Sequence, residues 1–367
     1  MSDWLNKLTS EHIRTLSPYQ SARRLFSASE GEQQLWLNAN ESPEASPASI
    51  DYHVFNRYPD CQPKDLIQAY ATYAGVDPQQ VIATRGADEG IELLIRAFCQ
   101  ANKDNILICP PTYGMYSISA ETFAVGVKKV PLNDDFSLDI TGIEKVVNDV
   151  NLVFLCSPNN PTGTLLAQSQ INDVLDLCRD KAIVVVDEAY IEFCAEHNVS
   201  KLLANNPHLV ILRTLSKAFA LAGIRCGFTI ADNAVIETLL KVIAPYPVPA
   251  PVAQVALQSL SPSGVENMRK RTEMLKSELQ QLSGALSAID GINIVGDTFA
   301  NFVLFKHRKS ADIMKYLIEN NLFIRDQSKQ VYLENCLRVT IGSPSQNAHF
   351  MALMDRYLNN SDLGKEL

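Results

Sequence analysis

The sequence predicts an α/β fold, with a large domain on a mostly parallel sheet and a smaller α+β domain after it. Short apolar runs rich in β-branched residues recur as NILIC (105–109), LVFLC (152–156), AIVVV (182–186) and LVILR (209–213). Helical stretches such as SQINDVLDLCRD lie between most of them, and this alternation is typical of strands buried in a parallel sheet. The length of 367 residues favours about two domains.

The elements are expected in the following order. The first 45 residues form an arm that packs on the small domain or on a partner chain, and residues 46–267 form the large domain. In it, VIATRGADEGIELLIRAF (81–98) predicts a turn running into a helix, because Ile91, Leu94, Ile95 and Phe98 share one helical face.

The small domain is expected over residues 268–367. The stretch 268–289 has one long amphipathic helical pattern, and further helices are expected near 310–320 and 346–358. The expected strands of this domain are GINIV (291–295), NFVLFK (301–306), LFIRD (322–326) and CLRVTIGS (336–343).

Composition and charge exclude several classes of function. The chain is 46% hydrophobic with a net charge of −9 and no basic run, which argues against nucleic acid as a partner. It has no apolar run long enough to span a membrane and no secretory leader, so we expect a cytoplasmic protein without a membrane partner. No two of the eight cysteines lie within four residues, so we expect no metal site and no disulfide framework.

Ligands of open α/β sheets bind beyond the carboxyl ends of the strands, and four segments lie at such positions. The segment 85–90 opens a helix with two glycines, so its backbone N–H groups could hold a phosphate, or Asp88 could be an ordinary cap. The segment 156–163, CSPNNPTG, is a rigid turn that could fix a side-chain amide.

The other two segments carry an acid and a lysine. Asp187 ends a buried strand, where a carboxylate is costly unless it caps a helix or meets a cation. Lys217 follows LVILR among hydroxyls and apolar residues, which makes an ordinary surface lysine less plausible. Together the segments supply the parts of a pyridoxal-5'-phosphate (PLP) site: a lysine, an acid for the pyridinium nitrogen and groups for a phosphate.

The chain resembles the fold-type I PLP aminotransferases, and among them the histidinol-phosphate aminotransferases. The resemblance covers nearly the whole chain. It runs from 18–24 (PYQSARR) to 337–340 (LRVT). It is most specific in these stretches: 36–41 (WLNANE), 56–59 (NRYP), 85–98, 109–116 (CPPTYGMY), 157–163 and 212–227.

The resemblance implies a role for each matching residue. Lys217 would form the imine with PLP and then act as the base that moves the proton, while Asp187 would pair with the pyridinium nitrogen. Tyr190 and Asn160 would bond the ring oxygen, and Tyr113 would stack on the ring. The PLP phosphate would be held by the following groups: the N–H groups of Ala87 and Asp88, then Thr214, Ser216, Arg225 and, from the partner subunit of a homodimer, Tyr58.

The implied reaction transfers an amino group between glutamate and imidazole acetol phosphate, giving 2-oxoglutarate and histidinol phosphate, and it also runs in reverse. Arg338 would bind the carboxylate or phosphate of either substrate, because a guanidinium fork suits both anions. Arg325, Tyr19 and Asn160 would assist in binding the substrate.

Other interpretations remain open on the sequence alone. A threonine-phosphate decarboxylase or an aromatic amino acid aminotransferase would share most of these residues. A transcription regulator on the same fold is disfavoured, because such proteins carry an added DNA-binding segment and the chain shows no basic stretch. A dehydrogenase is disfavoured because no GxGxxG follows a predicted strand.

Overall fold

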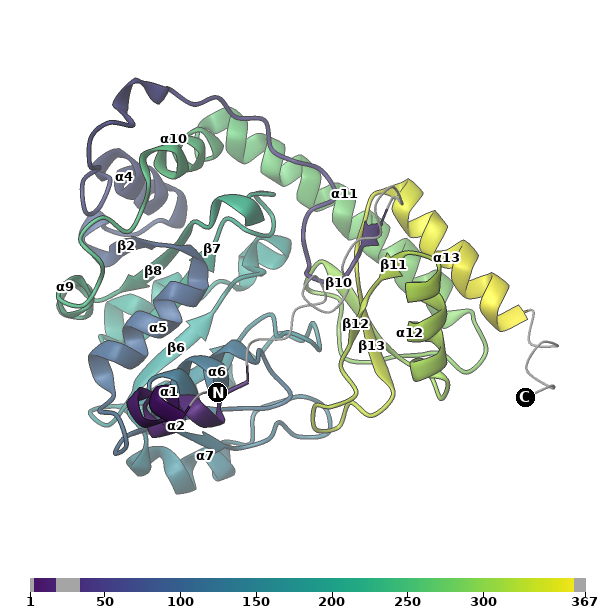
Figure 1. Ribbon diagram of the computed structural model, residues 1–367, viewed down its shortest axis with the longest axis horizontal. Coiled ribbons are helices and arrows are strands. Elements are labelled where there is room, and N and C mark those ends of the chain that lie inside the picture. Colours follow the sequence, from purple (N-terminus) through teal and green to yellow (C-terminus); the bar gives the residue numbers. More distant parts are fainter. Residues whose placement is uncertain (1–2, 18–33, 360–367) are drawn as a thin grey trace.

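The structure is a computed structural model that describes residues 3–17 and 34–359. Its main element is a seven-stranded sheet with the order β2-β8-β7-β6-β5-β3-β4 (Figure 1). Strand β8 runs antiparallel to both of its neighbours, and the other adjacent pairs are parallel. The strands are β2 (Val81–Thr84), β3 (Asn105–Ile108), β4 (Gly126–Lys129), β5 (Leu152–Cys156), β6 (Ile183–Asp187), β7 (Leu209–Thr214) and β8 (Gly227–Ala231).

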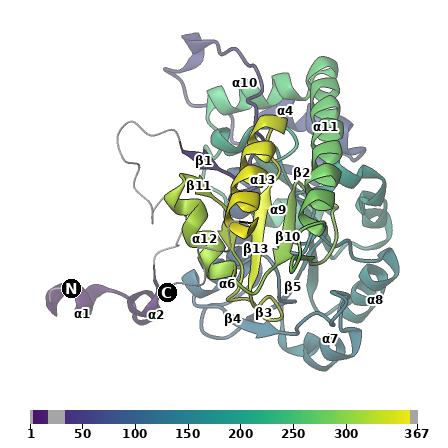
Figure 2. The same ribbon diagram turned by 90° about the vertical axis from the view of Figure 1, so that its right-hand side faces the viewer.

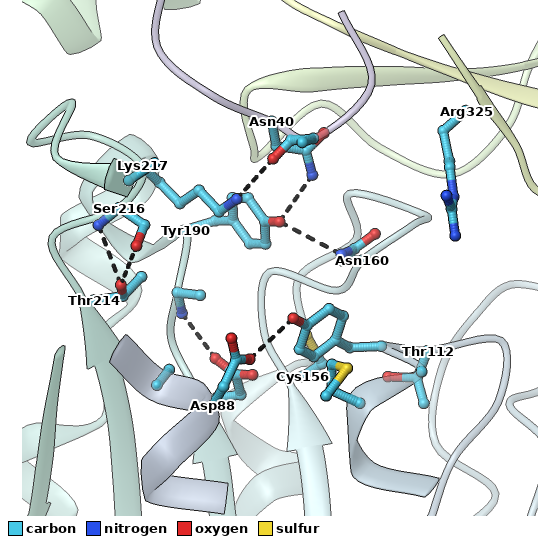
Figure 3. Close-up of a pocket in the computed structure, with 18 of the residues that line it drawn as sticks. Asn40, Asp88, Thr112, Cys156, Asn160, Tyr190, Thr214, Ser216, Lys217 and Arg325 are labelled. Atoms are coloured by element: carbon cyan, nitrogen blue, oxygen red, sulfur yellow. Dashed lines mark hydrogen bonds between the residues drawn. The ribbon is translucent and has the colours of Figure 1, made fainter. Parts of the chain in front are cut away.

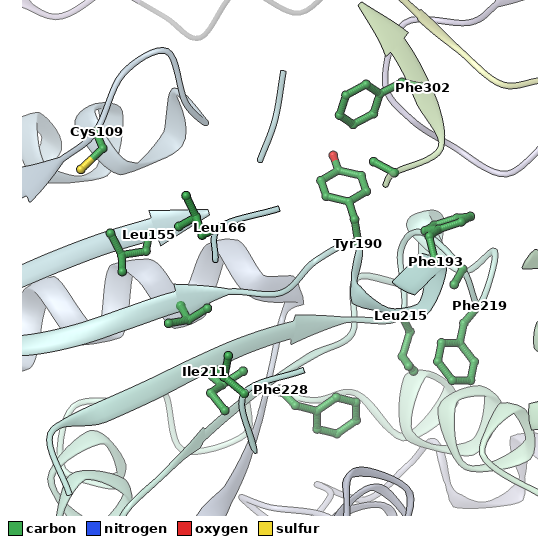
Figure 4. Packing of buried hydrophobic residues seen from close by; sticks show 14 of the residues in the cluster. Cys109, Leu155, Leu166, Tyr190, Phe193, Ile211, Leu215, Phe219, Phe228 and Phe302 are labelled. Atoms are coloured by element: carbon green, nitrogen blue, oxygen red, sulfur yellow. The ribbon is translucent and has the colours of Figure 1, made fainter. Parts of the chain in front are cut away.

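Both faces of this sheet are covered, which explains the continuous apolar runs. Successive side chains of a strand point to opposite faces, so Leu152 and Phe154 of β5 enter one core cluster while Val153 and Leu155 enter the other. Figure 4 shows part of the second cluster, which continues through Tyr190 to Phe302 of the smaller sheet.

Helices form the outer layers on the two faces. The face of Phe154 packs against α5 (Gly86–Phe98), α6 (Met115–Thr122) and α9 (Asn233–Leu240). The opposite face packs against α4 (Lys64–Ala74), α7 (Ile140–Val146), α8 (Gln168–Cys178), α10 (Ala250–Ser259) and α11 (Pro262–Ser287). Short 3-10 helices lie at Tyr52–Val54, Pro78–Gln80, Val147–Asp149, Ile191–His197, Ser200–Asn205 and Ala222–Ile224.

A smaller antiparallel sheet lies at the other end of α11, with the order β12-β13-β10-β9 (Figure 1). Its strands are β9 (Asn293–Ile294), β10 (Phe302–Lys306), β12 (Arg325–Asp326) and β13 (Cys336–Thr340). Figure 2 looks onto this sheet, with α12 (Ser310–Glu319) and α13 (Pro344–Asn359) beside it. The predicted boundary at residue 268 falls inside α11, and the division into domains stays a prediction.

The N-terminal part lies against both regions. Helix α2 (Glu11–Thr15) lies beside α6, whereas α1 (Asp3–Leu8) projects from the body (Figure 2). Strand β1 (Leu35–Trp36) pairs in parallel with β11 (Leu322–Phe323), and the Trp36 and Phe323 rings stack with centroids 4.2 Å apart. The expected strand 322–326 is therefore divided, because β11 pairs with β1 and β12 pairs with β13.

Three strands of the large sheet differ from the sequence prediction. Residues 81–84 were expected in a turn, but they form the fully buried strand β2, which pairs with β8. Strands β4 and β8 were not predicted. The sequence of β4, GVKK, lies at the sheet edge with half-exposed side chains, so it lacks an apolar run. In the described part of the chain, no helix is both long and apolar enough to cross a membrane.

Candidate active site

A cavity of about 440 Å³ lies where β5, β6 and β7 end, between the large sheet and the small one (Figure 3). These adjacent strands are parallel, so their last residues, Cys156, Asp187 and Thr214, meet at one edge. The residues predicted from the four strand-end segments that line it are Ala87, Asp88, Asn160, Asp187, Tyr190, Thr214, Ser216, Lys217 and Arg225. Tyr113, Arg325 and Arg338 also line this cavity.

One end of the cavity is a cup of anion-binding groups. Helix α5 begins there at Gly86, and its N-cap residue Arg85 makes no side-chain cap hydrogen bond, because a guanidinium has no acceptor atom. The Arg85 side chain donates to Glu89 at 2.8 Å. Across from this helix end, the Thr214 hydroxyl lies 2.9 Å from the Ser216 hydroxyl. An uncapped helix N-terminus beside two hydroxyls is suited to a phosphate group.

The Arg225 guanidinium completes the cup. Its Nη1 atom donates to the Ser216 hydroxyl at 3.3 Å, and its Nη2 atom donates to Asp88 Oδ2 at 3.1 Å. Gly86 has a φ of +77°, and a Cβ atom there would lie 2.7 Å from Arg225 Nη2. Glycine at position 86 therefore permits both the backbone conformation and the close approach of the guanidinium.

Lys217 lies in the middle of the cavity and is half-buried. Its Nζ atom donates to the Ala39 carbonyl oxygen at 2.9 Å and lies 5.7 Å from the centre of the Tyr190 ring (Figure 3). Burial lowers the pKa of Lys217 to about 8, and the charge of Arg338 acts in the same direction. A lysine with such a pKa has a sizeable neutral fraction near neutral pH, as a nucleophile or a base requires.

Asp187 is the buried acid of the site, with 2% of its surface exposed. Its Oδ2 atom accepts a hydrogen bond from the Tyr116 hydroxyl at 2.7 Å, and its Oδ1 atom accepts one from the Ala189 N–H at 3.1 Å. Burial raises the pKa of Asp187 to about 6, although both hydrogen bonds lower it. The carboxylate is therefore mostly ionised at neutral pH and can pair with a cation.

The Tyr190 hydroxyl lies at the centre of a polar network. It accepts hydrogen bonds from Asn40 Nδ2 at 2.8 Å and from Asn160 Nδ2 at 3.4 Å (Figure 3). Asn160 Oδ1 in turn accepts a bond from the Arg338 guanidinium, which also donates to the Asn38 carbonyl oxygen at 2.8 Å. Burial raises the pKa of Tyr190, while the positive charge of Arg338 opposes the shift.

The small sheet contributes two arginines to the lining of the cavity. Arg338 is buried on β13, and its guanidinium lies 5.2 Å from the centre of the Phe302 ring. Arg325 lies opposite Arg338 in the β12–β13 register and also lines the cavity. Tyr113 lies on the wall formed by the large sheet and donates from its hydroxyl to Asp88 Oδ1 at 3.0 Å.

One predicted residue does not line this cavity, and another lies outside the described part of the chain. Tyr58 is 81% exposed and stacks on Tyr246 with centroids 4.5 Å apart. It does not line the cavity of its own chain, and its role in the partner subunit stays a prediction. Tyr19 lies outside the described residues.

Several residues of the site were not assigned a role from the sequence. Asn38, Ala39 and Asn40 reach the cavity from the N-terminal segment, and Asn40 holds a φ of +55°, which asparagine adopts more readily than most residues. The motif WLNANE was noted, but nothing local shows that its carbonyl groups meet Lys217 and Arg338. Tyr116 is the other residue that was missed.

Comparison with known proteins identifies the family. The model of the aminotransferase class I and II family matches residues 32–353. The chain belongs to this family. It is 53% identical over 357 residues to a histidinol-phosphate aminotransferase of Pseudoalteromonas atlantica, covering 97% of this chain and 96% of the relative. The enzyme of the same name from Escherichia coli K12 is 51% identical over 343 residues, covering 94% of this chain and 95% of the relative.

Solved structures of this aminotransferase family share the fold. A histidinol-phosphate aminotransferase from Sinorhizobium meliloti, in complex with pyridoxal-5'-phosphate, matches with a TM-score of 0.83 at 20% identity, covering 96% of this chain and 98% of that one. The enzyme of that name from Clostridium acetobutylicum matches with a TM-score of 0.80 at 24% identity, covering 89% of this chain and 99% of that one. The predicted α/β class, with its mostly parallel sheet, is confirmed.

Proposed function

We propose that this aminotransferase uses PLP to move an amino group between histidinol phosphate and 2-oxoglutarate, giving imidazole acetol phosphate and glutamate in histidine biosynthesis. One structural observation carries the chemistry: a lysine with a lowered pKa, a buried carboxylate and a phosphate-binding cup share one cavity. The substrate follows from relatives named histidinol-phosphate aminotransferase that match over nearly the whole chain.

The residues of the cavity fit PLP by their chemistry. The cup can bind a dianionic phosphate through three kinds of donor: backbone N–H groups of the first turn of α5, the hydroxyls of Thr214 and Ser216, and the guanidinium of Arg225. Asp187 is ionised at neutral pH and buried, so it favours a protonated ring nitrogen close to it. A volume of about 440 Å³ also lies within the ordinary range for a small-molecule site.

Each side chain then has a task that its position supports. PLP, when bound, supplies an aldehyde that takes up amino groups and a ring that withdraws electrons from the substrate α-carbon. Lys217 would attach the cofactor and afterwards carry the proton at Nζ, because its lowered pKa lets it accept and release one near neutral pH. Tyr190 and Asn160 line the cavity and would hold the ring oxygen, and Tyr113 would pack on the ring.

The small-sheet side of the cavity binds the anionic end of the substrate. Arg338 is held in place by Asn160 and by the Asn38 carbonyl, so its fork is oriented before a ligand arrives. A fixed guanidinium can donate hydrogen bonds both to the carboxylate of glutamate and to the phosphate of histidinol phosphate. Arg325 lies next to it and adds positive charge for the phosphate ester, with Tyr19 as a further helper.

The active unit is proposed to be a cytoplasmic homodimer with shared active sites. Exposed aromatic and aliphatic side chains gather in residues 50–58, and such a patch on a soluble protein favours contact with another protein surface. Tyr58 extends from this segment, and in a dimer it would reach the phosphate cup of the partner subunit.

The test is an absorbance titration of the PLP-loaded protein with histidinol phosphate and no keto acid. We expect the band of lysine-linked PLP to give way to the band of the amine form of the cofactor. Adding 2-oxoglutarate should restore the first band and yield glutamate. Release of carbon dioxide from threonine phosphate, with the band of lysine-linked PLP retained after turnover, would show a decarboxylase instead. No response to histidinol phosphate would reject the proposed substrate.

A further inference from the structure

Tyr116 is a buried tyrosine behind Asp187 that the reaction described above leaves without a task. It lies on α6, has no exposed surface, and donates its hydroxyl proton to Asp187 Oδ2 at 2.7 Å. Burying a tyrosine hydroxyl costs free energy unless it makes a hydrogen bond, and here its partner is the carboxylate of Asp187.

The hydroxyl of Tyr116 has no competing acceptor of comparable strength among the described residues. The Cys156 thiol lies beside it, but this thiol donates to the Pro158 carbonyl at 3.5 Å. The Tyr116 ring is fixed as well, because it stacks on Phe154 with centroids 4.8 Å apart and meets the Tyr113 ring edge-on at 5.6 Å. One side chain thus supports both the acid and the aromatic wall of the cavity.

We propose that Tyr116 is a positioning residue that holds Asp187 ionised and in a fixed orientation for the ring nitrogen of PLP. This inference rests on the proposed function. With Oδ2 bound by Tyr116 and Oδ1 bound by the Ala189 N–H, the plane of the carboxylate is set by the protein before the cofactor binds. Each oxygen keeps a lone pair for a further donor.

The electrostatic setting of Asp187 makes this one hydrogen bond important. Of the surrounding charged groups, Asp88 is paired with Arg225, and Glu188 is paired with Arg213. The titratable and charged groups that face Asp187 or lie next to it are Asp88 of α5, Tyr113, Tyr116 of α6, Cys156 of β5, Glu188 and Tyr190. The tyrosines and the thiol have raised pKa values and are neutral near pH 7.

The experiment measures non-covalent PLP affinity in a Lys217→Ala background, so that the covalent link does not contribute. Tyr116→Phe should weaken PLP binding about fivefold near pH 6 and about tenfold well below it, because loss of the hydroxyl raises the pKa of Asp187 from about 6 by about one unit. The difference should shrink to less than about twofold above pH 8, where Asp187 is ionised in both proteins. The ionisation of PLP itself is common to both proteins and cancels in the ratio.

Two controls separate positioning from packing. Tyr70→Phe removes a hydroxyl from another buried tyrosine, which stacks on Phe228, and should leave PLP affinity unchanged at every pH. In an Asp187→Asn background, Tyr116→Phe should change PLP affinity less than about twofold, because the group it acts on no longer ionises.

Each outcome decides the question. If the ratio of PLP affinities with and without the Tyr116 hydroxyl is the same at all pH values, the proposal is overturned and Tyr116 is a packing residue. If Asp187→Asn itself leaves PLP affinity unchanged, the proposed role of Asp187 fails and this inference fails with it. If only Tyr116→Phe is without effect, this inference alone fails. Should Tyr116→Phe not fold, 3-fluorotyrosine at position 116 keeps the shape of the side chain with a more acidic hydroxyl. A more acidic hydroxyl is a stronger donor to Asp187, so the pH at which PLP affinity falls on acidification should move lower. If that pH does not change, the proposal is again overturned.

Discussion

The Nζ atom of Lys217 and the carbonyl oxygen of Ala39 lie 2.9 Å apart, although 178 positions separate the two residues. The carbonyl belongs to the segment that follows β1, and this segment continues to Asn40, which bonds to Tyr190. The N-terminal segment thus contacts the lysine and the tyrosine of the site at once. Because a carbonyl oxygen carries no net charge, it accepts a hydrogen bond from the neutral amine as well, whereas a carboxylate partner would favour the charged form of the lysine.

The first prediction concerns the pH dependence of cofactor capture. In the proposed function, the neutral amine of Lys217 would attack the aldehyde of PLP, and the lowered pKa of Lys217 is about 8. The rate at which the apo-protein becomes irreversibly labelled by PLP and borohydride should therefore rise through about pH 8 and level off by about pH 9. A rate that still climbs between pH 9 and pH 10 would indicate an ordinary lysine and contradict the lowered pKa.

Arg338→Lys should impair substrate binding without removing the positive charge. Lysine cannot bond both the Asn160 amide and the Asn38 carbonyl and also present a fork to an anion. We expect kcat/KM to fall about 100-fold for histidinol phosphate and for glutamate, or ~2.7 kcal/mol of lost transition-state stabilisation, with KM raised for both. Arg179→Lys on the surface is the matched control and should be silent. Unchanged KM values for both substrates would remove Arg338 from the anion site.

The glycine that begins α5 provides a prediction about the phosphate cup. In Gly86→Ala the new Cβ would lie 2.7 Å from Arg225 Nη2 at a φ of +77°. We expect about tenfold weaker PLP binding, because the guanidinium must move, and a loss of about 1–2 kcal/mol of unfolding free energy. Gly284→Ala is the control, because Gly284 lies inside α11 with open space around it. It should add ~0.5–1 kcal/mol of stability and leave the PLP affinity unchanged.

A buried ion pair behind the site should matter for stability. Arg213 and Glu188 are both buried, and Arg213 Nη2 lies 2.6 Å from Glu188 Oε2. Arg213→Met leaves the carboxylate buried without its partner, so urea unfolding of the apo-protein should show a loss of about 3–5 kcal/mol at neutral pH. The loss should decrease as the pH falls and Glu188 becomes protonated. Adding Glu188→Gln should recover part of it, and a loss below ~1 kcal/mol in the single variant would contradict this account.

The strands that carry the site were predictable because both of their faces are buried. In β5, β6 and β7 every position except the last one or two is apolar, so the runs are visible without any partner. Parallel neighbours also place their carboxyl ends together, which is why Asp187, Thr214 and Lys217 could be grouped from sequence order alone. The residue roles come from the family resemblance and stay predictions.

The rest depended on contacts between distant parts of the chain. Strand β8, GFTIA, begins at a glycine and has a threonine at its centre, so it lacks a continuous apolar run and is recognisable only through its pairing with β2 and β7. Tyr116 looks like an ordinary aromatic residue of a short helix until Asp187, 71 positions later, is placed against its hydroxyl. Backbone groups such as the Ala39 carbonyl carry no side-chain signal at all.

The last prediction tests whether two chains share each active site. Tyr58 is exposed and stacks on Tyr246 at the surface of its own chain, so any role at a phosphate cup requires the partner's cup. As homodimers, the Tyr58→Ala protein should show low activity and the Lys217→Ala protein negligible activity. Random re-pairing after mild denaturation and refolding makes half of the dimers mixed, and each mixed dimer has one site with both residues intact. Activity should therefore recover to about a quarter of the wild-type value. Recovery would be absent if Tyr58 acted on its own chain, since every site would then lack one of the two side chains.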